Sequence, residues 1–274
     1  MVVPKKNGKI RVCVDYRKRN AATVTDAFPL PFTNGVLDAV AGREVYSFLD
    51  GFSGYNQIRM HSADQEKTAF VTWGVFVAVV MMFELKMGPA TFQRIIMEIF
   101  EYIPGFMQVF LDDFAVYSRQ TEHSGHLQLC LDKGREYRLR LNAAKCVFGV
   151  TSGNLLGHIV SKDGIAIDPN KVREILEAPA PSNAKALSRF LGQIWWHSRM
   201  IRHLADFATL LHAAVHRLPF QWAEPKENSY QALKVMLSQA TVVQPAEWTK
   251  TFHVFVDASD IAIGNVLMQI IERK

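Results

Sequence analysis

Short runs of β-forming side chains predict strands through about residue 160. In residues 105–118, two such runs flank the adjacent carboxylates Asp112 and Asp113, a pattern typical of a β-hairpin with acids at its turn. Another apolar run begins at Val45 and ends at Asp50. Further strands are expected within residues 2–16 and 67–83.

Apolar side chains at helical spacing predict helices between these strands and through the second half of the chain. After Gly88 and Pro89, a helix is predicted whose inward positions are Phe92, Ile95, Ile96, Ile99, Phe100 and Ile103. Other helices are expected over about 33–40 and 122–138, after Asp168, twice within 182–216, and over about 226–239. The chain is therefore expected to have a mixed α/β (α+β) fold.

Composition indicates a globular protein that tolerates a polyanionic partner. The 274 residues are 49% hydrophobic, enough to fill the cores of small subdomains, and the net charge is +5. Residues 1–20 carry seven basic side chains against Asp15 alone: Lys5, Lys6, Lys9, Arg11, Arg17, Lys18 and Arg19. Such a cluster suits phosphate binding, and a solvated basic face is the alternative.

Cysteine spacing and hydropathy bear on the compartment. Cys13, Cys130 and Cys146 lack the close spacing of a zinc site, which favours a reduced, intracellular setting in cytoplasm or nucleus. The longest apolar run, 74–83, is too short to cross a bilayer, and no signal-like region follows Met1, so no membrane association is expected. His123 and His126 share a helical face without further ligands nearby, which makes a metal site there unfavourable.

The paired acids are the main candidate for chemistry. Adjacent carboxylates repel each other unless a cation offsets their charge, so Asp112 and Asp113 favour a divalent metal with oxygen ligands. If Asp50 faces this hairpin across one sheet, three carboxylates converge, which suits a two-metal site. A solvated turn is the alternative for the Asp-Asp pair taken alone.

The sequence around these acids resembles that of reverse transcriptases. Residues 110–113, Phe-Leu-Asp-Asp, look like the Tyr-x-Asp-Asp box of that family. Residues 49–58 are similar to the Leu-Asp-x-x-Ser-Gly-Tyr-x-Gln-Ile block of gypsy-type retrotransposon polymerases. The resemblance runs in colinear order to about residue 269. Near its end, Asp257 matches the first catalytic carboxylate of a ribonuclease H domain.

The resemblance implies a polymerase right-hand fold with an antiparallel palm sheet, fingers and a helical thumb. It divides the chain into fingers and palm at 1–168, thumb and connection at 169–245, and the truncated start of a ribonuclease H-like domain, with a lone strand, at 246–274. The implied activity is RNA-directed DNA synthesis from a primer on an RNA or DNA template. Oligomeric state is not predicted.

The same resemblance assigns roles to individual residues. Asp50, Asp112 and Asp113 are the catalytic ligands of two Mg²⁺ ions, for which Mn²⁺ can substitute. The deoxynucleoside triphosphate is bound by Lys5, Lys6, Arg11, Tyr55, Phe83 and Lys86. Among these, Lys5 or Lys6 and Arg11 contact the triphosphate, and Tyr55 is the gate that rejects a 2′-hydroxyl; a half-buried core tyrosine is the alternative.

Four positions depart from the family pattern: Arg19, Met82, Glu84 and Met87. Glu84 stands where the family has a glycine that serves a positive φ or a close backbone approach, and a tolerated surface change paired by Lys86 is the alternative. A decayed retroelement copy that folds without polymerising is therefore a rival prediction. A two-metal nuclease is a third, against which Tyr55 and Arg11 argue.

Overall fold

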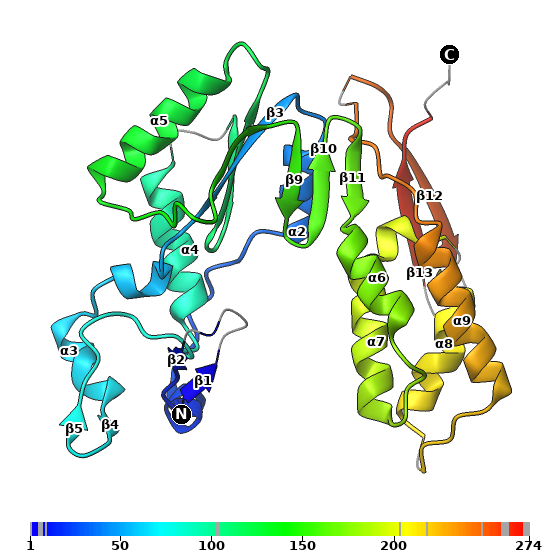
Figure 1. Cartoon of the computed structure of the whole chain (residues 1–274), viewed down its shortest axis with the longest axis horizontal. Coiled ribbons are helices and arrows are strands. Elements are labelled where there is room, and N and C mark those ends of the chain that lie inside the picture. The colour runs from blue at the N-terminus through cyan, green and yellow to red at the C-terminus, as the bar shows by residue number, and fades with distance from the viewer. Residues whose placement is uncertain are drawn as a thin grey trace. The chain divides into compact units, whose positions relative to one another are not determined.

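The structure is a computed structural model that describes residues 2–4, 8, 10–101, 105–202, 204–217, 219–247, 249–258 and 263–270. The chain forms two compact units, Met1–Lys162 and Asp163–Lys274. Figure 1 shows their elements in chain order. None of the helices in the described ranges is long and apolar enough to span a membrane.

A four-stranded antiparallel sheet forms the centre of the first unit. Its order is β6-β7-β3-β8, with bounds β3 (Val45–Asp50), β6 (Met107–Phe110), β7 (Asp113–Ser118) and β8 (Val147–Val150). The predicted hairpin is confirmed, since Phe110 pairs with Asp113 across a turn formed by Leu111 and Asp112. Strands β3 and β7 pair over their whole length, which sets Asp50 opposite Asp113.

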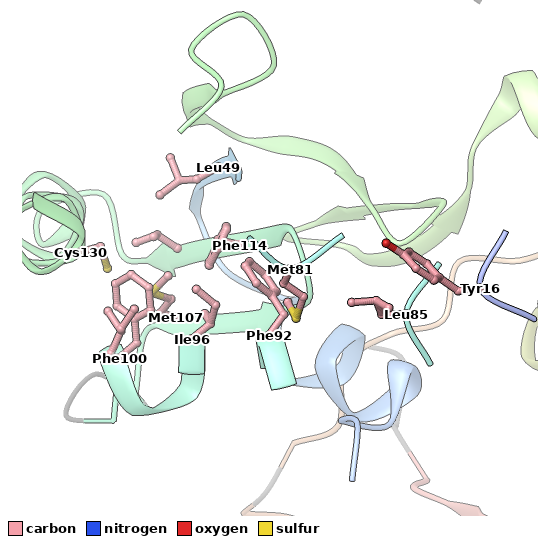
Figure 2. Close-up of a cluster of buried hydrophobic side chains, with 12 residues drawn as sticks. Tyr16, Leu49, Met81, Leu85, Phe92, Ile96, Phe100, Met107, Phe114 and Cys130 are labelled. Carbon is pink, nitrogen blue, oxygen red and sulfur yellow. The ribbon is translucent and has the colours of Figure 1, made fainter. Parts of the chain in front are cut away.

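Two helices bury one face of this sheet. Helix α4 (Gly88–Ile99) is the helix predicted after residues 88–89, and α5 (His123–Glu136) falls within the predicted 122–138. Their apolar sides meet Leu49, Met107 and Phe114 from the strands, as Figure 2 shows. Because Phe92 and Ile96 are each 1% exposed at this contact, α4 is firmly anchored under the turn of the hairpin.

Smaller elements complete the first unit. They are β1 (Val2–Pro4), β2 (Ile10–Val12), α1 (Arg17–Ala22), α2 (Thr33–Val40), α3 (Ser62–Gln65), β4 (Phe70–Val71), β5 (Val75–Phe76), β9 (Ser152–Leu155), β10 (His158–Ser161) and the 3-10 turns Gly54–Gln57 and Glu66–Thr68. Two strands lie within 67–83, as predicted, but they are short and do not belong to the central sheet. Strands β4 and β5 pair only with each other, and Trp73 at their turn is 92% exposed, so this apolar run does not join the central sheet.

A buried histidine ties α5 to the sheet. His123 accepts or donates through both ring nitrogens, with Nε2 2.8 Å from Ser47 Oγ and Nδ1 2.8 Å from Ser118 Oγ. The ring of His126 instead stacks on Phe106, with centroids 3.8 Å apart. His123 therefore serves packing between β3, β7 and α5. Burial, with a smaller effect of His126, lowers the pKa of His123.

Stability of the first unit is expected to fall as the pH drops below about 6.5, because unfolded His123 takes up a proton that the folded site disfavours. The folded pKa is depressed, so this stability is present at pH 7.5 and is lost toward pH 5.5. Urea midpoints should therefore drop less over this range in His123→Gln than in the wild type. His61→Gln, at an exposed position, is the control and should retain the full drop. Equal drops in all three proteins would contradict the assignment.

The second unit is a helical bundle followed by a hairpin. Its elements are β11 (Gly164–Ile167), α6 (Pro169–Glu177), α7 (Ala184–Trp196), the 3-10 turn Ser198–Met200, α8 (Leu204–Val215), α9 (Glu224–Ser238), β12 (His253–Ala258) and β13 (Ile263–Met268). Asp168 caps α6 as predicted, its Oδ1 accepting from Asn170 N at 2.9 Å. The end of α6 is held by α9, where buried Lys234 donates to the carbonyl of Leu176 at 3.0 Å.

The strand that carries Asp257 has a partner. Residues 253–258 pair in register with 263–268, so the expectation of a lone strand is wrong. The sequence analysis missed β13 because its apolar positions are interrupted by Gly264 and Asn265, which weaken a strand pattern. Nearly every residue of this hairpin is exposed.

Candidate functional site

The predicted acids gather where the two central strands end. Asp50 is the last residue of β3 and Asp113 the first of β7, and the two are register partners. Lys145, which the sequence analysis did not select, reaches this cluster, and its Nζ donates to Asp50 Oδ2 at 2.7 Å. The loop that carries Lys145 is held in place because Asn142 N–H donates to the carbonyl of Asp50 at 2.8 Å.

Asp112 brings a buried carboxylate oxygen to the cluster. Its Oδ1 is buried and has no hydrogen-bond partner in the described part of the chain. Burial raises the pKa of Asp112 to about 6, with further contributions from the Asp50 and Asp113 carboxylates and an opposing one from Lys145. The pKa of Asp113 is also raised, first by partial burial and then by Asp50. The cluster therefore concentrates negative charge that calls for a cation.

The donor chemistry of this cluster fits a divalent metal. Carboxylate oxygens are the ligands that hard cations prefer, and Asp112 Oδ1 is a buried acceptor whose desolvation a bound cation would offset. Within the described ranges, no three His, Cys, Asp or Glu side chains already have the arrangement of a complete ligand set. The cation that contacts Asp50 is the Lys145 ammonium, so metal binding requires the side chains to rearrange around it.

The turn that carries Asp112 is strained and is held by hydrogen bonds from helix α4. Leu111 has a φ of 52°, which a side-chain-bearing residue rarely adopts. Gln93, on the buried side of α4, accepts from Leu111 N at 2.7 Å and donates to the carbonyl of Val109 at 3.1 Å. The sequence analysis missed Gln93, although a glutamine beside Phe92 on the apolar face of the helix was the available signal. Gln93 acts as a positioning residue for the turn.

A missing side chain makes room for Asp112. Gly54 begins a 3-10 turn, and a Cβ at this position would collide with Asp112 Oδ1 and lie 2.6 Å from Phe92 Cζ. The Phe92 ring has no space to retreat, since it is 1% exposed. The close approach of Asp112 and Phe92 thus explains the glycine of the Ser-Gly-Tyr motif. A left-handed backbone does not explain it, since the φ of Gly54 is not positive.

The variant Gly54→Ala is expected to lower the free energy of unfolding by about 1–3 kcal/mol, because the added methyl overpacks a filled site. It should also displace Asp112 and reduce catalysis by about a hundredfold. Thermal melting and primer extension measure the two effects. Gly35→Ala is the control, since only Phe32 Cβ at 3.9 Å would meet its methyl group. Wild-type stability and activity in Gly54→Ala would show that the site relaxes freely.

Tyr55 lies between the acids and two phenylalanines. Its ring meets Phe83 edge-on, with centroids 5.1 Å apart, and Phe92 edge-on at 5.3 Å. Burial raises the pKa of Tyr55, and the Asp112 carboxylate adds to the shift. The half-buried ring is therefore fixed in orientation beside Asp112, a geometry that serves either packing or a gate.

The remaining predicted nucleotide-binding residues divide into two groups. Lys5 and Lys6 lie outside the described residues, and Arg11 lies in β2 opposite Val3. Phe83 and Lys86 flank a turn near Tyr55, where Lys86 N–H donates to Asn20 Oδ1 at 3.0 Å. Arg19, one of the departures from the family pattern, donates through Nε to the carbonyl of Lys67 at 2.9 Å.

Glu84 occupies a backbone conformation that favours glycine. Its φ is 72°, and Asn20 Nδ2 holds its carbonyl at 2.7 Å. Among the described residues, no ion pair joins Glu84 to Lys86. The alternative that Glu84 is a tolerated surface residue paired with Lys86 thus lacks its ion pair. The positive φ expected where the family has a glycine is present at Glu84.

The variant Glu84→Gly is expected to raise the free energy of unfolding by about 0.5–1 kcal/mol, because relief of the left-handed strain exceeds the extra entropy of an unfolded glycine. Urea unfolding measures the difference. Lys86→Gly, in the same turn and without a positive φ, should lose stability instead. A midpoint that falls in both variants would show that Glu84 is not strained.

Comparison with known proteins places these features in a family. Residues 3–160 match the family described as reverse transcriptase (RNA-dependent DNA polymerase), and residues 222–274 match the RNase H-like domain found in reverse transcriptase. The retrovirus-related Pol polyprotein from transposon opus of Drosophila melanogaster is 35% identical over 283 residues, covering 97% of this chain and 28% of that protein. The chain thus spans about a quarter of the length of that relative.

Solved structures agree on the fold. The foamy viral protease-reverse transcriptase in complex with double-stranded DNA has a TM-score of 0.87 at 19% identity, over 94% of this chain and 46% of that one. The same viral protein in complex with an RNA/DNA hybrid has a TM-score of 0.85 at 18% identity, over 98% and 39%. These likenesses confirm the predicted right-hand fold of helices and antiparallel sheet. The match to the reverse transcriptase family covers residues 3–160, more than half of this chain. The chain therefore belongs to the reverse transcriptase family, as its resemblance to gypsy-type retrotransposon enzymes predicted.

Proposed function

We propose that the chain is an RNA-directed DNA polymerase that adds deoxynucleotides to a primer on an RNA or DNA template. The observation that carries this proposal is the convergence of Asp50, Asp112 and Asp113 at the ends of β3 and β7, with the buried Asp112 Oδ1 unpartnered in the described chain. Tyr55 beside this cluster supplies an aromatic wall against which a sugar can be positioned. A nuclease needs no such wall.

Asp50 and Asp112 would hold two divalent ions, Mg²⁺ or Mn²⁺, with Asp113 beside them as a weaker ligand. When bound, such ions make the primer 3′-hydroxyl more acidic and neutralise the leaving pyrophosphate. Gln93 holds the turn that carries Asp112, and Lys145 partly neutralises the charge of Asp50 through an ion pair. The chain's own contribution is therefore the placing of three carboxylates on a rigid, buried support.

Substrate binding extends from this centre. Lys5 or Lys6 with Arg11 would bind the triphosphate of a deoxynucleotide, since guanidinium and ammonium groups suit phosphoryl oxygens. Tyr55, with Phe83 and Lys86 nearby, would hold the sugar and exclude a 2′-hydroxyl. The two described complexes of the foamy viral protein, with DNA and with a hybrid, support a duplex as the partner.

Domain roles follow from the same proposal. Residues 1–168 would form fingers and palm, 169–245 the thumb and connection, and 246–274 the beginning of a ribonuclease H-like domain. Cys130 and Cys146 form no disulfide within the described residues, which supports a reducing compartment, in cytoplasm or nucleus.

Primer extension tests the proposal directly. A labelled DNA primer on an RNA template should lengthen with deoxynucleotides and Mg²⁺, and should not lengthen when EDTA replaces the metal. A folded protein that binds the primer but never extends it, with Mg²⁺ or Mn²⁺, would establish the decayed-copy alternative. Primer shortening without nucleotides would establish the nuclease.

A further inference from the structure

A basic pocket lies beside the acid cluster in the first unit. It encloses about 570 Å³ and is lined by Phe52, Asn56, Gln57, Arg59, Arg138 and Arg140, among others. A volume of this size suits a small ligand. Three exposed arginines therefore line one hollow.

The charge of this arginine pocket is not neutralised within the described ranges. No acidic residue lines it, and Arg59, Arg138 and Arg140 form no ion pair there. Elsewhere in the unit, Arg94 pairs with Asp26 at 2.7 Å. Guanidinium groups that converge without a counter-charge repel one another, so their convergence favours an anionic ligand.

The framework of the pocket is rigid. Gln57 donates through Nε2 to the carbonyls of Phe52 at 2.8 Å and Arg140 at 3.0 Å, and its Oε1 accepts from Arg140 N at 2.7 Å. These bonds fix two lining segments against each other. A single glutamine thus holds the position of Arg140 relative to the strand end.

Arg138 reaches the pocket from a strained position. It follows α5 with a φ of 57°, and Leu139 N–H closes the helix end by donating to the carbonyl of Gly134 at 2.8 Å. Glycine is the favoured residue at such a helix end, and arginine costs stability there. The negative end of the helix dipole accounts for a basic residue near this point, but not for Arg59, which comes from a different segment.

The pocket shares its backbone with the acid cluster. Phe52 N–H donates to the carbonyl of Arg140 at 2.9 Å, directly after Gly51 forms a bridge with Leu141. Asp50 and Lys145 lie on continuations of these same two segments. An anion in the pocket would therefore lie near the acid cluster. Its contacts would be with the arginines and not with the three carboxylates.

We propose that this arginine pocket binds a polyphosphate group, either free pyrophosphate or the phosphate tail of a nucleotide, through Arg59, Arg138 and Arg140. Phosphate oxygens accept paired bonds from guanidinium groups, and three such groups match the multiple charges of pyrophosphate. Because the three arginines line a single hollow of about 570 Å³, a compact anion is favoured over a nucleic-acid backbone. This inference concerns binding and stands whether or not the chain polymerises.

Isothermal titration with pyrophosphate, without divalent metal or primer, tests the site. The background is Lys5→Gln/Lys6→Gln/Arg11→Gln, which removes the triphosphate contacts proposed for catalysis. One equivalent of pyrophosphate should bind. Each of Arg59→Gln, Arg138→Gln and Arg140→Gln should weaken binding by about tenfold. The control is Arg119→Gln, which removes the same charge from an exposed position and should leave affinity unchanged.

Three outcomes would overturn the proposal. They are a background protein that binds no pyrophosphate, an equal loss in Arg119→Gln, and displacement of pyrophosphate by a single-stranded DNA 12-mer at matched phosphate concentration. The last would assign the arginines to a nucleic-acid backbone. Thermal melting should be unchanged in the arginine variants, and Arg140→Lys should bind with intermediate affinity because it keeps the charge but loses the paired donors.

Discussion

Replacing Asp112 with asparagine is expected to lower the rate of primer extension by about a thousandfold or more, because the variant keeps the shape but loses the charge that holds the metals. Single-nucleotide addition under saturating primer measures the chemical step. Asp132→Asn, which removes a carboxylate paired with Arg135 on α5, is the matched control and should extend at the wild-type rate. Extension by Asp112→Asn at that rate would remove Asp112 from the metal site.

Folding measurements separate this loss from damage to the fold. The pKa of folded Asp112 is raised to about 6, so the protonated form favours folding, and this contribution is lost as the pH rises through 6. At pH 7 the ionised carboxylate is therefore unfavourable, and Asp112→Asn should melt no lower than the wild type without metal. Near pH 4 the two proteins should converge. A lower melting temperature at pH 7 would attribute lost activity to unfolding.

Tyr55→Val is expected to reduce the preference for deoxynucleotides over ribonucleotides by about a hundredfold, since the smaller side chain leaves room for a 2′-hydroxyl. The ratio of kcat/KM for the two sugars is the proper measure. Loss of the edge-on contacts with Phe83 and Phe92 lowers stability too, but it affects both substrates alike.

Tyr55→Phe is the matched control because it retains the ring and removes only the hydroxyl. Its sugar preference should equal that of the wild type. If Tyr55→Val keeps the full preference while losing stability, Tyr55 is a packing residue and the gate lies elsewhere. If both variants lose the preference, the hydroxyl rather than the ring determines the selection.

Local patterns predicted many of the elements, and the sequence motifs predicted which acids lie together. The 105–118 hairpin and the helix after Pro89 could be recognised because their signals lie within one short stretch. Lys145 could not be found in this way, since its contact with Asp50 joins residues 95 positions apart. The roles of Lys5 and Lys6 remain predictions, as these residues lie outside the described structure.

The exposed position of the strands within 67–83 could not be predicted from their sequence pattern. An apolar run predicts buried side chains, yet Val71, Trp73 and Val75 are mostly exposed. The hydrophobicity of these residues therefore does not indicate that their strands are solvent-exposed. Gln93 was missed for the opposite reason. A polar side chain on an apolar helix face is ambiguous until its partners, here Leu111 and Val109, are known.

The close approach of Gly54, Phe92 and Asp112 also constrains how this sequence can change over generations. A side chain at position 54 would meet both Phe92 and Asp112, so a smaller residue at position 92 removes the contact with the ring and opens space into which the Asp112 carboxylate can shift. These positions are far apart in the chain and are joined only by a steric contact. Suppressors of Gly54→Ala should therefore appear first at position 92, and a selection for restored primer extension would find them there.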